Sequence, residues 1–157
     1  MELAIAVLQQ GYLTPAQIES SRAGMGLDLQ LIEDETYFCV EERGFLIGCG
    51  GWSRRATLYG GSHSAGRDAR LLDPAIDRAR IRAMYTHPEH TRKGVGALIL
   101  ETAENAARAA GFEVAELVGT MAGQPFYEAA GYVVEREWHD ENGAVPVPIV
   151  TMSKRLI

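Results

Sequence analysis

Residues 85–98 of the sequence read YTHPEHTRKGVGAL and connect a predicted strand to a predicted helix. The strand is predicted over residues 79–87, because Pro88 stops an otherwise strand-like run. Apolar side chains recur at helical spacing over residues 95–110, and Gly111 follows as a helix-ending signal. This strand, loop and helix therefore form the centre of the predicted fold.

The loop between this strand and this helix has the features of a phosphate-binding site. Helix N-termini expose unpaired N–H groups and carry partial positive charge, and glycines let a backbone come close to a phosphate. A tight strand-to-helix turn without a ligand is the alternative, and the glycine spacing matches neither a Walker loop nor a dinucleotide fingerprint. The predicted pyrophosphate site consists of Arg92, Lys93, Gly94, Val95, Gly96 and Ala97.

Further elements flank this centre on both sides. One helix is predicted over residues 2–10 and a short one between Pro125 and Gly131. Another helix is predicted to begin at a capping box formed by Thr14 and Gln17, with Pro15 in its first position. Strands are predicted over residues 36–41, 45–52, 113–118, 132–139 and 145–154. The pattern indicates one α/β or α+β domain with a mixed sheet that spans residues 1–157. The polar stretch 53–78 is long for a loop, which favours a functional or mobile segment.

Composition excludes several classes of protein. Apolar residues make up 46% and charged residues 23%, which is typical of a globular domain. The net charge of −6 argues against nucleic acid as the main partner, and no apolar run is long enough for a membrane. Cys39 and Cys49 match no metal spacing, so we expect free thiols, no metal and a cytoplasmic location.

Two segments together resemble a known family. Residues 85–98 resemble the acyl-CoA-binding signature of the GNAT superfamily of N-acetyltransferases, and residues 124–132 (QPFYEAAGY) resemble its late helix. The resemblance implies a mostly antiparallel, twisted sheet that is flanked by helices and splayed at the cofactor site. The family usually opens with a strand before its first helix, whereas this chain begins in helical sequence, so either that edge strand is lost or the chain is shortened. The implied reaction is acetyl transfer from acetyl-CoA to an amine of a small molecule or a peptide.

The resemblance also implies roles for individual residues. Backbone groups of Met84 and Thr86 would pair with the pantetheine arm, and an N–H near Tyr85 would polarise the thioester carbonyl. Tyr127 would be the general acid toward sulfur, with packing as its alternative role. Thr120, in place of the family's Asn, and Phe126 complete the implied cofactor site.

The general base and the acceptor site are less defined by the sequence. Arg80 stands where many relatives carry a glutamate, and a guanidinium is no base at neutral pH. The expected catalytic base is His63, and the alternatives are His87, Glu33, Glu35 or a water relay.

Acceptor recognition is expected on the splayed side of the sheet, opposite the cofactor. Trp52, Tyr59 and the long polar stretch are expected to line it, and four arginines there (Arg54, Arg55, Arg67 and Arg70) could bind an anionic group or be solvated. A non-catalytic acyl-CoA-binding or sensor domain with the same fold is the alternative function. A homodimer is one option for the assembly.

Overall fold

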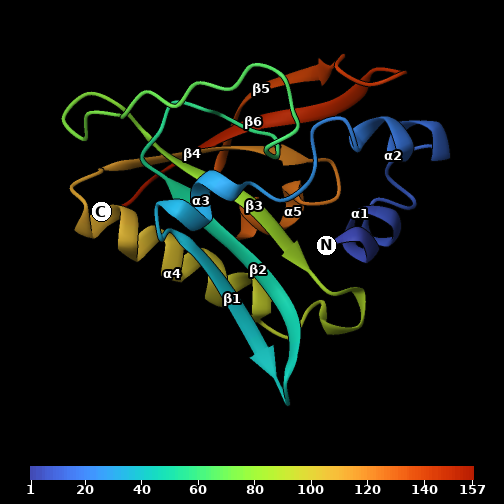
Figure 1. The fold of residues 1–157 in the computed structure, drawn as a ribbon, viewed down its shortest axis with the longest axis horizontal. Helices are drawn as coiled ribbons and strands as arrows, with labels where there is room; N and C mark the ends of the chain where they lie inside the picture. Colours follow the sequence, from blue (N-terminus) through green and yellow to red (C-terminus); the bar gives the residue numbers. More distant parts are fainter.

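The computed structural model describes all 157 residues and contains one mixed sheet of six strands (Figure 1). The strands are β1 (Tyr37–Glu42), β2 (Phe45–Ser53), β3 (Ala79–Thr86), β4 (Val114–Thr120), β5 (Val133–Asp140) and β6 (Val147–Arg155), in the order β1-β2-β3-β4-β6-β5. All neighbours are antiparallel except β3 and β4, which are parallel. The mixed, mostly antiparallel sheet predicted from the sequence is confirmed.

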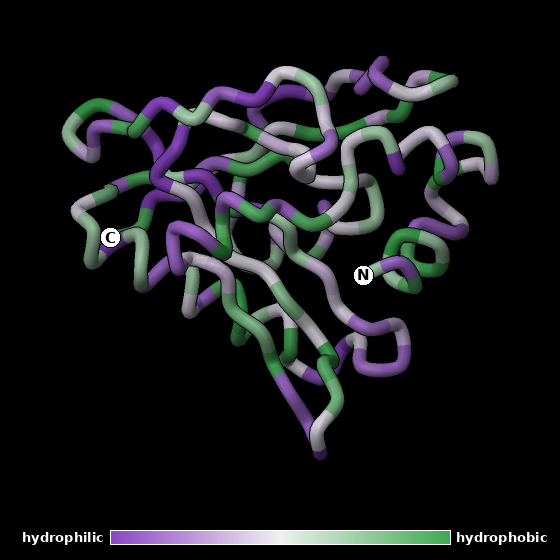
Figure 2. The backbone as a smooth tube through the Cα atoms, in the orientation of Figure 1, coloured by the Kyte–Doolittle hydropathy of each residue, from purple (hydrophilic) through white to green (hydrophobic).

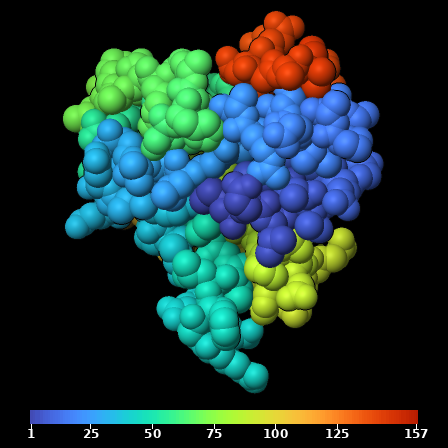
Figure 3. Space-filling model, turned by 45° about the vertical axis from the view of Figure 1, so that its right-hand side comes forward, coloured from blue at the N-terminus to red at the C-terminus, as the bar shows by residue number.

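Helices cover the sheet and lead into it. They are α1 (Glu2–Leu8), α2 (Pro15–Ser21), α3 (Leu29–Glu33), the 3-10 turn η1 (Pro88–His90), α4 (Val95–Ala109) and α5 (Gln124–Ala129). The long helix α4 packs on β1, β2 and β3, whereas α2 contacts β6 and α5 contacts β4 and β5. In the space-filling view, α1 and α2 lie between the loop before α4 and the turn that joins β5 to β6 (Figure 3).

The N-terminal part is helical, and β1 is the first strand in the chain. Thr14 forms the predicted capping box, since its hydroxyl accepts from the Gln17 N–H and the Gln17 side chain accepts from the Thr14 N–H. Helix α2 ends at Ser21. The five-residue helix α3 was not predicted, because one turn is too short to show periodicity.

The main core lies between α4 and the sheet. Its fully buried members include Ala103, Ala107 and Leu117, and Trp52 packs edge-to-face on Phe112 with ring centroids 5.8 Å apart. The hydropathy tube shows α1 as a mostly apolar segment and the loop before α4 as a polar one (Figure 2). None of the helices combines the length and the apolar character that crossing a membrane requires.

Strands β3 and β4 pair only at their beginnings. The pairs are Ala79 with Ala115 and Arg80 with Glu116, after which the two strands diverge (Figure 1). β3 then pairs only with β2, and β4 only with β6. The sheet is therefore splayed between its third and fourth strands, as the family resemblance implied.

A bulge in β3 lies beside this opening. Cys49 pairs with Tyr85 and Gly51 with Arg82, so Gly50 opposes two residues of β3, and Ala83 has a left-handed φ of 51°. A Cβ on Gly50 would lie 2.3 Å from Met84 Sδ and 3.2 Å from Met84 Cα. The glycine therefore permits the close approach of the two strands at the bulge.

Candidate active site

A cavity of about 890 Å³ occupies the opening between β3 and β4. One wall is β3 from Ile81 to Thr86 and another is β4 from Leu117 to Thr120, while α1, the loop before α4 and α5 close the sides. Its volume lies in the range of small-molecule and cofactor sites. Only three of its lining residues carry charged side chains, namely Arg82, Arg92 and Asp140.

The loop before α4 presents free N–H donors to one end of this cavity. The backbone N–H groups of residues 92–97 donate no hydrogen bond within the protein, so they are available to a ligand. Gly94 has a left-handed φ of 85° with open space where a Cβ would project. A Cβ on Gly96 would meet Phe126 at 3.3 Å. The loop therefore fits a pyrophosphate group, which accepts several N–H bonds at a helix N-terminus.

The predicted cofactor residues gather around this end, with two differences. Met84, Tyr85, Thr86, Arg92, Gly94, Gly96, Ala97, Thr120 and Phe126 line the cavity. The side chain of Val95 is instead buried beside Ile47 and Ile99, and Lys93 is exposed outside the cavity lining. These two residues contribute backbone N–H groups to the loop but no side chain to the cavity.

The free edge of β3 runs from the loop toward the centre of the cavity. Beyond Arg80 this edge has no partner strand, so the polar groups around Met84 are open to an extended ligand. Tyr37 fixes the bulge from the other side, since its hydroxyl donates to the Ala83 carbonyl at 3.0 Å. The Tyr85 hydroxyl accepts from the Gly26 N–H at 2.9 Å, and burial raises the pKa of Tyr85 to about 12.

Tyr127 of α5 lines the cavity beside Gly119 of β4. Its ring packs edge-to-face on Phe126 and Tyr132, with centroids 5.1 Å and 5.8 Å away. Its hydroxyl has no hydrogen-bond partner in the protein and is not among the fully buried polar atoms, so it opens to the cavity. Burial raises the pKa of Tyr127 well above its ordinary value, which keeps the phenol protonated at neutral pH.

The far end of the cavity contains Tyr59 and the acid Asp140. The Tyr59 hydroxyl donates to Asp140 Oδ1 at 3.1 Å, and the Asn142 amide donates to the same oxygen at 2.6 Å. Burial, followed by the charge of Asp140, raises the pKa of Tyr59. Tyr59, which was expected in the acceptor site, lines the cavity, and it lies beside an acid that the sequence analysis did not single out.

Other predicted residues lie away from the cavity. Trp52 is 3% exposed in the main core and lines no part of the cavity, because it is on the α4 side of the sheet. His63 is also outside the lining, and its Nε2 lies 2.9 Å from the Arg22 carbonyl oxygen. His87 accepts a hydrogen bond from the Glu89 N–H, and neither Glu33 nor Glu35 reaches the cavity.

The four arginines of the long connection are engaged in the protein. Arg55 pairs with Asp34 at 2.7 Å and Arg67 with Asp28 at 2.8 Å, while the exposed Arg70 lies 3.5 Å from Asp77. The guanidinium of Arg54 lies over the ring of Trp52. Arg80 pairs with Glu116, at the last point where β3 and β4 are joined.

The residues that sequence reasoning missed share one property: they act through partners distant in the chain. Asp140 meets Tyr59 across 81 positions, and Asp28 meets Arg82 across 54. Among these features, only the glycines of β2 could have been found from the local sequence. Glycine weakens a strand, so Gly48, Gly50 and Gly51 in one strand indicate that something packs closely against it.

Comparisons with known proteins found one matching family and many similar structures. Residues 33–134 match the family model for the acetyltransferase (GNAT) domain. A search of curated proteins found no match. A GCN5-related N-acetyltransferase from Rhodopseudomonas palustris has a similar structure, with a TM-score of 0.70, 18% identity, and coverage of 98% of this chain and 83% of that one.

Two further similar structures contain coenzyme A. The PaiA N-acetyltransferase of Thermoplasma acidophilum has a TM-score of 0.62 at 17% identity, covering 98% of this chain and 89% of that one. An aminoglycoside 6'-N-acetyltransferase has a TM-score of 0.58 at 12% identity, covering 99% and 90%.

Proposed function

Because the chain belongs to the GNAT acetyltransferase family and is by family acetyl-CoA-dependent, we propose that it acetylates an amine of a small molecule or a peptide by direct attack, with Tyr127 as the general acid. The observation that carries this proposal is the Tyr127 hydroxyl, which is protonated, free of protein partners and open to the cavity. A phenol in that state is available to donate a proton to a leaving group.

The cofactor site in this proposal combines two free sets of backbone groups. The N–H groups of residues 92–97 bind the pyrophosphate, and the open edge of β3 around Met84 pairs with the pantetheine arm. When bound, acetyl-CoA supplies an acetyl group activated as a thioester. The bulge at Ala83 supports this role, because it turns backbone groups out of the ladder with β2 at the middle of the cavity.

The chain's own residues then direct the transfer. An N–H near Tyr85 polarises the carbonyl, the bond between the amine nitrogen and the acetyl carbon forms, and the carbon–sulfur bond breaks. Tyr127 gives its proton to the departing sulfur. The acceptor nitrogen loses a proton to water in the cavity in this scheme, since His63 lies outside the cavity lining and its Nε2 is close to the Arg22 carbonyl.

Release of free thiol tests the proposal. Purified protein is mixed with acetyl-CoA and a panel of primary amines, free thiol is followed with a chromogenic reagent, and the products are identified by mass spectrometry. We expect thiol release that depends on the amine and yields the N-acetyl product. Tight binding of coenzyme A without thiol release for any amine or peptide would instead support a sensor domain.

A further inference from the structure

Three carboxylates of the protein have less than a tenth of their residue surface exposed: Asp28, Glu104 and Asp140. Asp28 pairs with Arg82 and Arg67, and Glu104 pairs with Lys154. Asp140 takes part in no ion pair, although it is only 6% exposed. A buried charge without a counter-ion is costly, and the hydrogen bonds that the protein donates to Asp140 all go to one of its two oxygens.

The two oxygens of Asp140 have different surroundings. Oδ1 accepts from the Tyr59 hydroxyl and from the Asn142 side chain, which fixes the orientation of the carboxylate. Oδ2 accepts no hydrogen bond, and it lies toward Gly24, 3.7 Å from the position of a Cβ there. Oδ2 is not a fully buried unpaired atom, and Asp140 and Gly24 both line the cavity. Oδ2 is therefore a fixed, accessible acceptor.

The electrostatics of the cavity leave this charge unopposed. Arg82 donates to the carbonyls of Thr57 and Gly60, on either side of Tyr59 in the chain, but it is already paired with Asp28. Arg92 lies in the loop before α4, at the other end. The end of the cavity that contains Tyr59 and Asp140 thus presents one negative charge to whatever enters it.

The sheet register places this charge far from the cofactor wall. Thr120 of β4 pairs with Ile149 of β6, and Asp140 of β5 pairs with Val147, two residues further along the same face. Two strand spacings and two residue steps separate the Cα atoms of Thr120 and Asp140 by about 12 Å. The apolar side chains of Ile149 and Val147 line the cavity between them.

From this arrangement we infer that the acceptor carries a second, cationic amine, which Asp140 Oδ2 binds as an ammonium ion while a neutral amine at the other end of an apolar chain reacts. The inference rests on the proposed function and narrows its acceptor to diamine-like compounds. The reacting nitrogen must be unprotonated, so the amine that a carboxylate holds as an ammonium ion is not the one that attacks. Asp140 is thus a specificity determinant in the acceptor site.

The test compares 1,5-diaminopentane with pentylamine and uses two variants. Asp140→Asn keeps the shape and the Oδ1 acceptor but removes the charge, and Glu141→Gln removes one charge from the neighbouring exposed residue. We expect the wild type to prefer the diamine in kcat/KM by about 10- to 100-fold, the range for a hydrogen bond to a charged group. The preference should disappear in Asp140→Asn, through KM, and persist in Glu141→Gln.

A binding measurement separates this inference from the proposed reaction. Calorimetry on the protein saturated with coenzyme A gives the Kd of 1,5-diaminopentane without any turnover. We expect a Kd about 10- to 100-fold weaker in Asp140→Asn, an unchanged value in Glu141→Gln, and in the wild type a Kd that rises with salt. Unchanged diamine binding in Asp140→Asn, binding insensitive to salt in the wild type, or an equal loss of kcat for both amines would overturn the inference. Absence of turnover with intact, Asp140-dependent binding would contradict only the proposed reaction.

Discussion

Tyr127 combines two roles in one side chain. Its ring is part of the main core, where it packs on Phe126 and Tyr132, while its hydroxyl opens to the cavity. The two roles can be separated, because phenylalanine keeps the ring and removes only the oxygen. Packing alone would make this oxygen dispensable.

We predict that Tyr127→Phe lowers kcat by about 10²-fold or more, which is the usual contribution of a general acid. The Kd for coenzyme A and the thermal midpoint should stay close to wild type, because the core contacts of the ring remain. Tyr132→Phe is the matched control, since its hydroxyl is buried outside the cavity. Steady-state kinetics measures kcat and calorimetry measures the Kd for coenzyme A in both variants. Equal kcat values for the two variants would show that Tyr127 serves only in packing.

At this scale the sequence identified residues whose signal is local. The glycines at 94 and 96 are adjacent to a strand end and a helix start, so their role follows from the chain itself. Trp52 was expected in the acceptor site and is in the core, because residues 50–53 of β2 are all buried and alternation therefore does not assign its face. Asp140 was missed because only strand pairing and the contact with Tyr59 bring it to the cavity.

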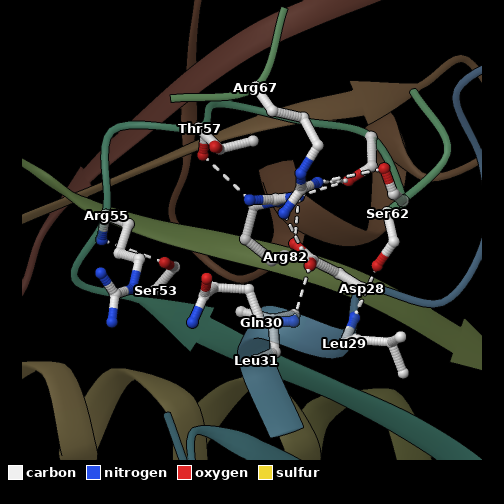
Figure 4. A network of polar contacts seen from close by, with 12 residues as sticks. Asp28, Leu29, Gln30, Leu31, Ser53, Arg55, Thr57, Ser62, Arg67 and Arg82 are labelled. Atoms are coloured by element: carbon white, nitrogen blue, oxygen red, sulfur yellow. Dashed lines mark hydrogen bonds and ion pairs between the residues drawn. The ribbon is translucent and has the colours of Figure 1, made fainter. Parts of the chain in front are cut away.

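Among the elements, the connection from Arg54 to Arg78 is held by contacts that its local sequence does not reveal. Its length favoured a functional or mobile segment, and in the structure it is held to the start of α3 and to β3 by polar contacts (Figure 4). Arg82 donates to the carbonyls of Thr57 and Gly60 and pairs with Asp28, and Arg67 donates to Gly60 and Gly61. The partners in these contacts are distant in the chain, so local composition could not predict the contacts.

We predict that Asp28→Ala destabilises the protein by about 3–5 kcal/mol, the usual result of leaving one partner of a buried ion pair alone. Asp28 and Arg82 have side chains 1% and 3% exposed, and Arg82 would keep its charge without a counter-ion. Glu19→Ala is the control, since Glu19 is 80% exposed beside Arg22 and should cost at most about 1 kcal/mol. Urea unfolding measures both variants, and a loss below 1 kcal/mol for Asp28→Ala would show that this pair does not hold the connection.

In the molecule as a whole, two halves of the sheet meet at a narrow junction. β1, β2 and β3 form one half and β4, β6 and β5 the other, with two residue pairs and the ion pair between Arg80 and Glu116 joining them. Helix α4 packs on the first half and α5 on the second. A ligand that contacts β3 and the loop before α4 on one side, and α5 on the other, therefore bridges the two halves of the sheet.

We predict that coenzyme A raises the thermal midpoint by about 5–10 °C at 100 times its Kd. Binding to the native state alone contributes about 2.7 kcal/mol at that concentration, and each kcal/mol shifts the midpoint of a domain of this size by about 2–4 °C. Pantetheine, which lacks the pyrophosphate, should give a smaller shift at equal concentration, because it leaves the N–H groups of residues 92–97 unpaired. Arg92→Ala should reduce the shift more than Lys93→Ala, since only Arg92 lines the cavity. Differential scanning fluorimetry measures all four cases, and equal shifts for pantetheine and coenzyme A would show that the loop before α4 does not bind the pyrophosphate.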